Sequence, residues 1–198
     1  MKAYEILNEM PYLHPGEMSR HILDNGVSIA AIKRAYVTLG RVGELIVYID
    51  HHSSHVIVID PGSEVSDSRL SQVFRVQFKP VPLLNFPNNL QNIRQVDKVA
   101  VQRAYESQEI ATDVYKMLVD RGYTVVSDVS QFEPAQGLWK KVARESGYKT
   151  YVADIDHGIF KDANGKDIVY DGTNISDHEI WTSGSDFNGN YRVLILTK

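Results

Sequence analysis

Short apolar runs follow one another through the first part of the chain, and each is bounded by Gly, Asp or Pro. These runs are rich in Val and Ile, which fit the pleated surface of a sheet. The pattern therefore predicts a meander of strands. Its members are Val27–Ile32, Glu44–Ile49 and Val56–Ile59, and the alternating segment Val73–Phe78 predicts a further strand before a proline-rich connection. A polar helix over Gly16–Asn25 is expected before them, with Gly26 just past its C-terminal end.

The spacing of the apolar positions changes at Gln108. Ile110 and Val114 recur at helical spacing and Gly122 closes the segment, so a helix is predicted here. Ser107 is expected to be its N-cap, because a serine hydroxyl can accept a hydrogen bond from a free N–H group of the first turn.

The chain then returns to a strand pattern before a second helix. Tyr123–Asp128 predicts a buried strand of the kind that follows a βαβ crossover, and Pro134 suits the first turn of the next helix. Trp139 is expected to pack inside that helix as a large apolar side chain. From Tyr151 onward, short strands separated by turns are expected. The earlier segment Pro80–Pro87 is interpreted as a connection that forms either a lid or a partner surface.

Length and composition limit the classes of protein to which the chain can belong. With 198 residues, of which 43% are hydrophobic, the chain can bury one sizeable core, and a single domain is predicted. The net charge of −4 argues against stable binding of nucleic acid. Cysteine is absent, which excludes disulfides and thiolate metal sites. No apolar block suits a signal peptide or a membrane span, so a soluble cytoplasmic protein without a membrane partner is expected.

Three segments near the centre of the chain carry a recognisable motif. They are Val99–Tyr105, Gln108–Ala111 and Val114–Leu118. This motif resembles that of the GCN5-related N-acetyltransferases, and in particular the small divergent members found in bacteriophage genomes. The continuation from Val126–Gln131 to Gly137–Lys141 is similar to the second strand–helix unit of those phage proteins. Together these segments cover about a fifth of the chain.

The resemblance implies the α/β fold of the acyl-CoA N-acyltransferases, which is a mixed, mostly antiparallel sheet flanked by helices. On this interpretation, a meander over residues 1–95 precedes a cofactor-type core over residues 96–148. C-terminal strands would occupy residues 149–198. The sheet is expected to be splayed near Val99–Val101.

The resemblance also implies acetyl-CoA as the cofactor. Its pyrophosphate would rest on backbone N–H groups of a loop at a helix N-terminus. In this chain Glu109 takes the place of the central glycine of that loop, and Glu106 stands where a basic residue is common. A carboxylate a few ångströms from the pyrophosphate costs on the order of 1 kcal/mol even when water screens the charges. The implied cofactor-binding residues are Val99, Val101, Ser107, Gln108, Glu109, Ile110 and Ala111.

Acetyl transfer to an amine requires a general base, and in this family a tyrosine often protonates the leaving thiolate. Trp139 occupies the position of that tyrosine. Asp128, at the carboxyl end of its strand, is the candidate base, and Tyr115 is the candidate proton donor, with Tyr105 as the alternative. Capping of the following turn is the alternative role for Asp128.

Two functions remain open from the sequence. The first is an acetyl-CoA-dependent N-acyltransferase of phage type, which would act on an unidentified amine of a small molecule or a protein. The second is a catalytically silent protein with the acetyltransferase fold, which would bind a protein partner in a phage particle or in the host cytoplasm. The acidic loop and Trp139 favour the second function.

Other groups of polar residues have simpler interpretations than a functional site. A histidine group near the end of the second predicted strand lacks the further ligands that a metal site needs, so no metal is assigned. Its members are His51, His52 and His55. Asp154 and His157 suit the solvent-facing edge of a strand. The segment Asp162–Asp167 is expected to form a hairpin turn.

Overall fold

The computed structural model describes residue 23 and residues 26–81, 90–128, 133–155, 157–181 and 192–198. The predicted helix over Gly16–Asn25 therefore lies outside the described residues, except for Leu23, which is helical. Most of the Pro80–Pro87 connection also lies outside them. Gly26 has a φ of +55°, the left-handed conformation expected of a residue that ends a helix.

One sheet of 11 strands runs through the described chain, and its order is β10-β8-β11-β7-β6-β5-β4-β3-β2, with β1 on β5 and β9 on β8. Neighbouring strands are antiparallel apart from β6 and β7, which run parallel. The strands are β1 (Val27–Ser28), β2 (Tyr36–Val42), β3 (Leu45–Asp50), β4 (His55–Ser66), β5 (Arg69–Lys79), β6 (Ile93–Val101), β7 (Thr124–Val126), β8 (Lys149–Asp154), β9 (Gly158–Ile159), β10 (Val169–Tyr170) and β11 (Arg192–Thr197).

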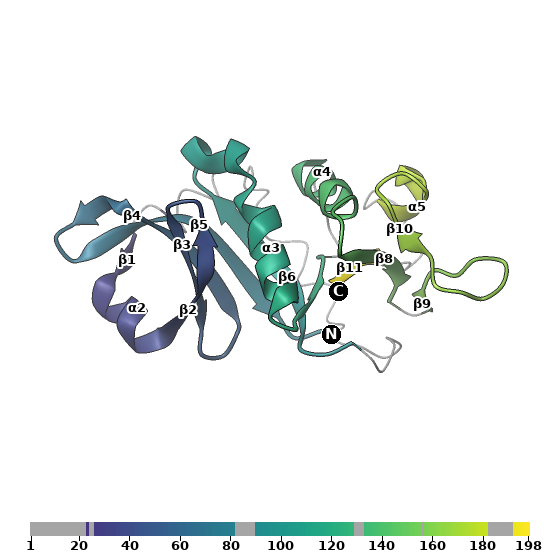
Figure 1. The fold of residues 1–198 in the computed structure, drawn as a ribbon, viewed down its shortest axis with the longest axis horizontal. Coiled ribbons are helices and arrows are strands. Elements are labelled where there is room, and N and C mark those ends of the chain that lie inside the picture. The colour runs from purple at the N-terminus through teal and green to yellow at the C-terminus, as the bar shows by residue number, and fades with distance from the viewer. Residues whose placement is uncertain (1–22, 24–25, 82–89, 129–132, 156, 182–191) are drawn as a thin grey trace, which may run out of the picture.

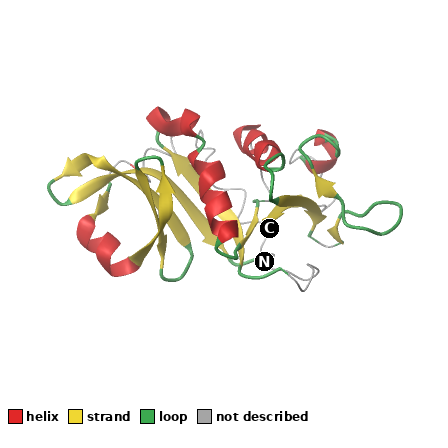
Figure 2. Ribbon diagram, viewed as in Figure 1, coloured by secondary structure: helices red, strands yellow, loops and turns green. Residues whose placement is uncertain are grey.

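Helices lie on both faces of this sheet. Three of them, α3, α4 and α5, follow one another along the same face, which we call the helical face (Figures 1 and 2). The helix α2 packs on the other face, which we call the opposite face, beside β4. The described α-helices are α2 (Ile29–Ala35), α3 (Ile110–Asp120), α4 (Glu133–Val142) and α5 (Asp177–Ile180), and a 3₁₀ helix, η2 (Arg103–Gln108), precedes α3.

The strand β4 shows how one apolar run supplies both faces. Val56 and Val58 point into the core beneath the helical face. The alternate residues Ile57 and Ile59 pack with Ile32 of α2 on the opposite face. Successive side chains of a strand point to opposite faces, so a continuous Val and Ile run marks a strand that is covered on both sides.

The predicted class of a mixed α/β fold with a mostly antiparallel sheet is confirmed. One predicted strand is wrong, because Val27–Ile32 is a strand only at Val27–Ser28 and then becomes α2. The hydroxyl of Ser28 accepts a hydrogen bond from the N–H of Ala31 at 3.0 Å and so caps the helix. A serine cap followed by two alanines outweighs the strand preference of the flanking isoleucines.

The two central helices form where the apolar spacing places them. The helix α3 begins at Ile110, and α4 carries Pro134 in its first turn as predicted. The predicted N-cap is wrong, because Ser107 belongs to η2 and Glu109 takes the N-cap position of α3. Trp139 is only 2% exposed, which confirms its predicted packing role.

The segment Asp162–Asp167 forms the predicted turn. The N–H of Asp162 donates to the carbonyl of Lys166 at 2.9 Å, and Lys161 pairs with Asp167 across the turn. Within the described ranges, no helix combines the length and the apolar character needed to cross a bilayer.

Candidate functional site

The parallel strands β6 and β7 stay together over a short distance only. Their pairing joins residues 93–95 to residues 124–126. Beyond this point β6 continues to Val101 along β5, while the chain after β7 follows β11, where the N–H of Ser127 donates to the carbonyl of Leu194 at 2.8 Å. We call the place where the strands part the strand fork; Val96–Val101 borders it on one side, and Ser127 and Asp128 border it on the other.

A buried amide side chain holds the base of the strand fork. Gln95 is the last residue of β6 to pair with β7, and its Nε2 donates to the carbonyl of Ser127 at 3.1 Å. The Oγ of Ser127 accepts from the N–H of Leu194 at 2.9 Å and donates to the carbonyl of Asp128 at 3.0 Å. These bonds fix the backbone of residues 127 and 128 against β11, away from the continuing β6.

Beyond Gln95, the edge of β6 that faces the strand fork has no strand partner among the described residues. The N–H of Gln102 donates to the carbonyl of Val73 at 2.8 Å, while Val101 stands opposite Phe74. This bonding pattern makes Val101 and, two residues earlier, Val99 members of non-hydrogen-bonded pairs, whose N–H and C=O groups point away from β5. In the described part of the chain, β7 supplies no partner for them on that side. The backbone groups predicted to bind a cofactor thus lie on an open strand edge.

The N-terminus of α3 follows directly in the chain. The first intrahelical bond runs from the N–H of Asp113 to the carbonyl of Glu109 at 3.2 Å, so the N–H groups of Ile110, Ala111 and Thr112 precede it. No described side chain caps this end of the helix. The first turn of α3 therefore presents N–H groups that none of the described side chains caps, at the positive end of the helix dipole.

Glu109 combines two features that bear on this helix terminus. Its φ is +55°, a left-handed conformation that glycine adopts without strain. Its carboxylate forms an ion pair with the ammonium of Lys141 on α4. Glu109 thus combines a backbone conformation that favours glycine with a negative charge at the start of α3. The side chains of Ser107 and Gln108 lie outside the described part of the structure.

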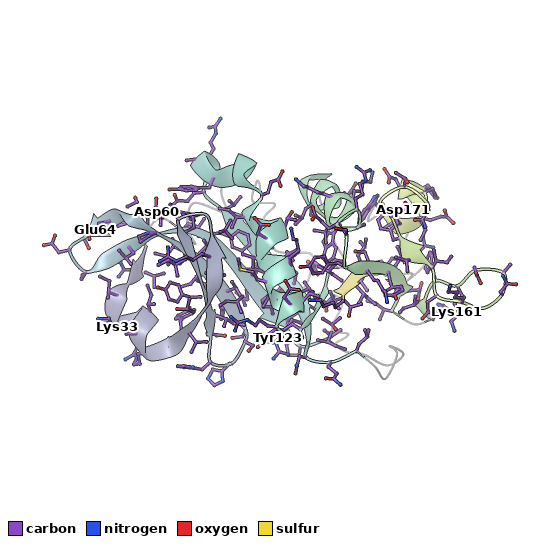
Figure 3. All side chains as sticks on the ribbon, viewed as in Figure 1. Lys33, Asp60, Glu64, Tyr123, Lys161 and Asp171 are labelled. Atoms are coloured by element: carbon purple, nitrogen blue, oxygen red, sulfur yellow. The ribbon has the colours of Figure 1, made fainter. Side chains whose placement is uncertain are left out.

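The 3₁₀ helix η2 is tied to the sheet from the other side. The hydroxyl of Tyr105 donates to the carboxylate of Asp60 at 2.6 Å, and this hydrogen bond raises the pKa of Tyr105. Asp60, labelled in Figure 3, belongs to β4. The Nε2 of Gln102 also donates to the carbonyl of Gln72 at 3.1 Å. These contacts hold the segment between β6 and α3 against β4 and β5.

Asp128, the predicted base, lies at the strand fork in an ion pair. Its Oδ1 is 2.8 Å from the Nζ of Lys79, at the end of β5. The same ammonium lies 3.6 Å from Asp97, which stands where the β5–β6 register shifts. Sequence reasoning missed Lys79 and Asp97; the one signal that could have found them is a pair of opposite charges within otherwise apolar strand segments.

Tyr115, the predicted proton donor, is a core residue. It is 1% exposed, and its ring lies 5.6 Å from that of Trp139 between α3 and α4. Burial raises the pKa of Tyr115, because a phenolate loses its hydration in an apolar surrounding. The structure thus brings Val99, Val101, Glu109 and Asp128 to neighbouring elements, and it gives Tyr115 a packing role.

The histidines outside this region take part in a turn. The Nε2 of His51 lies 3.2 Å from the carbonyl of Arg34, and the Nδ1 of His55 lies 3.2 Å from the carboxylate of Asp50. Among the described residues, no group of three or more His, Cys, Asp and Glu side chains is arranged to hold a metal ion.

Comparison of the chain with known proteins identifies no relative. No protein-family model, no curated protein and no solved structure matches the chain significantly.

Proposed function

We propose that the protein is an acetyl-CoA-dependent N-acyltransferase that acts on an amine. The observation that carries this proposal is the arrangement of one strand–helix–strand unit. In it, β6 and β7 part after a short parallel pairing, and no described side chain caps the start of α3 between them. The open edge of β6 and the free N–H groups of α3 are consecutive in the chain, so one extended ligand could use both.

The two parts of the site suit the two parts of acetyl-CoA. The N–H groups of Ile110, Ala111 and Thr112 would bind the pyrophosphate. The N–H and C=O groups of Val99 and Val101 would pair with the amide-containing arm of the cofactor, in the way that an added strand pairs with a sheet edge. The left-handed conformation of Glu109 supports the alignment with a glycine-rich phosphate loop.

The acidic side chain of Glu109 weakens such a site without abolishing it. Its partner Lys141 lies at the N-terminus of α3 and carries the positive charge that a pyrophosphate needs. If the pyrophosphate forms an ion pair with Lys141 in place of Glu109, the carboxylate of Glu109 is left exposed to water. Water and salt then screen the repulsion between this carboxylate and the pyrophosphate.

Asp128 is the proposed base. The amine nitrogen would attack the thioester carbonyl, a C–N bond would form and the C–S bond would break, and the amine proton would pass to the carboxylate of Asp128. The ammonium of Lys79 lies 2.8 Å from this carboxylate and holds it at the strand fork. The leaving thiolate would take its proton from water, because a thiol with a pKa of about 8.5 is mostly protonated near neutral pH.

Calorimetric titration of the purified protein with acetyl-CoA and with desulfo-CoA tests the cofactor site. Micromolar binding, which corresponds to about 8 kcal/mol, is expected for both ligands. Ala111→Asp places a carboxylate in the first turn of α3 and should weaken binding about tenfold or more. Ala163→Asp, which makes the same change in an exposed turn, is the matched control and should bind as the wild type does.

A second candidate is a catalytically silent binding protein with this fold. The ion pair between Glu109 and Lys141 favours it, since a carboxylate already stands at the helix N-terminus. Absence of heat with millimolar acetyl-CoA, in the wild type and in Glu109→Gly alike, would contradict the enzyme proposal and leave this candidate.

A further inference from the structure

On the opposite face of the sheet, a partly buried arginine has no hydrogen-bond or ion-pair partner among the described residues. Arg75 lies in the middle of β5, directly across from Ile57 on β4 and Ala100 on β6. Both neighbours are buried and neither can accept a side-chain hydrogen bond. Across the described ranges, no hydrogen bond or ion pair reaches the Arg75 guanidinium. Arginine is seldom withdrawn from water in this way unless an anion pairs with it.

A second unsatisfied donor stands beside Arg75 on the same strand. Gln72 stands directly across from Ile59, which packs with α2 on the opposite face. Paired residues of neighbouring strands point to the same face, so the side chain of Gln72 lies on the opposite face, as that of Arg75 does. The intervening Val73 is the extra residue where the register shifts, and it packs into the core of the helical face. Gln72 is 2% exposed, and its Nε2 has no hydrogen-bond partner in the part of the chain that is described. A buried amide without a partner costs free energy unless a ligand satisfies it.

The polar groups nearest to Arg75 do not neutralise it. Tyr36 lies close enough for the charge of Arg75 to act on its phenol, but burial outweighs this effect and raises the pKa of Tyr36, so the phenol stays neutral. Asp50 also acts on Tyr36, yet its carboxylate accepts hydrogen bonds from Ser54 and from the N–H of His55 within its own turn. The positive charge of Arg75 is therefore left to an anion from outside the protein.

We infer that Arg75 and Gln72 form a carboxylate-binding site. A guanidinium and a side-chain amide present several N–H donors, which match the oxygens of a planar carboxylate. Ala100 stands between Val99 and Val101 in β6, and one strand spacing of about 4.8 Å separates β6 from β5. A small molecule could thus place its carboxylate at Arg75 and its amine at the strand fork. For the acetyl-transfer step, this inference rests on the proposed function. It identifies the acceptor substrate as an amine that also carries a carboxylate.

The first test measures carboxylate binding without acetyl-CoA. In ¹⁵N-labelled protein, the side-chain signals of Arg75 and Gln72 are identified by their loss in Arg75→Met and Gln72→Leu. Millimolar γ-aminobutyrate is expected to shift both signals in the wild type, whereas butylamine should leave them unchanged. Unchanged signals with γ-aminobutyrate and also with β-alanine would overturn the inference, whatever the protein does with acetyl-CoA.

The second test uses the reaction itself, followed by release of free CoA thiol. γ-Aminobutyrate is expected to be acetylated and butylamine is not. Arg75→Met should raise KM for γ-aminobutyrate about tenfold or more and change kcat little, because the lost contacts bind the acceptor away from the reacting atoms. Equal turnover of the two amines would refute the carboxylate site while the acetyltransferase proposal stands. Shifted NMR signals without any acetyl-CoA binding would refute the enzyme proposal and keep the site.

Stability separates this role from a structural one. If Arg75 supported the fold, Arg75→Met would lower the melting temperature. An unpaired, partly buried charge predicts the reverse, so Arg75→Met should unfold at the same temperature as the wild type or higher. Arg41→Met on the exposed part of β2 is the matched control and should keep the wild-type KM.

Discussion

The two faces of β5 and β6 differ in what their residues do. On the helical face, Phe74, Val76 and Phe78 of β5 are buried in a continuous apolar core. On the opposite face, the alternating residues of the same strand include two cations. Lys79 forms ion pairs with carboxylates, whereas Arg75 has no hydrogen-bond or ion-pair partner among the described residues. The comparison teaches that one strand can carry the stability of the fold on one side and its candidate chemistry on the other. Variants of the two faces should therefore fail in different ways.

The largest effect is expected from the helical face. Trp139→Ala removes the buried indole that packs on Tyr115 and should destabilise the protein by about 3–5 kcal/mol. Urea unfolding measures the change. Trp139→Phe, which keeps an aromatic ring, should lose clearly less. If Trp139→Ala left the unfolding midpoint unchanged, the helical face would not be the stabilising core.

A smaller loss is expected at the base of the strand fork. Ser127→Ala removes the hydroxyl that accepts from the buried N–H of Leu194, and leaving that N–H unsatisfied should cost about 1–3 kcal/mol. Chemical denaturation is the measurement, with the exposed Ser66→Ala as control. An equal, negligible loss in both variants would show that this bond does not hold β7 to β11.

A pH-dependent effect is expected at the β3–β4 turn. Burial alone would raise the pKa of Asp50, but hydrogen bonds from Ser54 and His55 outweigh it and lower the pKa. The charged carboxylate thus contributes stability above the ordinary aspartate pKa of about 3.9, and this contribution is lost as the pH falls through the lower folded value.

The test compares Asp50→Asn with the wild type in urea unfolding between about pH 7 and about pH 3. The variant should be less stable by about 1 kcal/mol at the higher pH. The difference should shrink as the solution becomes more acidic. A difference that stays constant over this range would contradict the assignment.

The smallest effect is expected at Glu109, where two terms oppose each other. Glu109→Gly relieves the left-handed backbone by about 1 kcal/mol and removes a surface ion pair worth less than about 1 kcal/mol. Thermal unfolding should therefore change little. Glu109→Ala loses the ion pair without the relief, so it should unfold at a lower temperature than Glu109→Gly. The opposite order would show that the +55° conformation is not strained.

Much of the secondary structure could be predicted because its signals are local. The helix around Ile110 and Val114 shows the helical period of 3.6, and the strand at Val56–Ile59 is a short continuous run of Val and Ile, as expected of a strand covered on both faces. The failures are local as well. A serine cap turned Ile29–Ile32 into a helix, and the 3₁₀ turn moved the N-cap from Ser107 to Glu109.

The candidate site could be located only roughly from the sequence. The motif led to Val99, Val101 and the loop that contains Glu109, all of which lie beside the strand fork or the start of α3. It did not indicate that Tyr115 is in the core, since the inner face of a helix depends on where its neighbours lie. Arg75 carries no signal of its own, because its lack of a partner among the described residues is a property of the surrounding strands.

The sequence alone thus determined most of the predicted strands and helices, though not α2, and that Trp139 is buried, because backbone propensity and apolar spacing act between near neighbours in the chain. The tertiary structure decided that β11 lies between β7 and β8, that β6 leaves β7 after Gln95, and that Lys79 meets Asp128. Those contacts join residues far apart in the sequence. Their formation depends on strand order and register, which the pattern of any single segment does not contain.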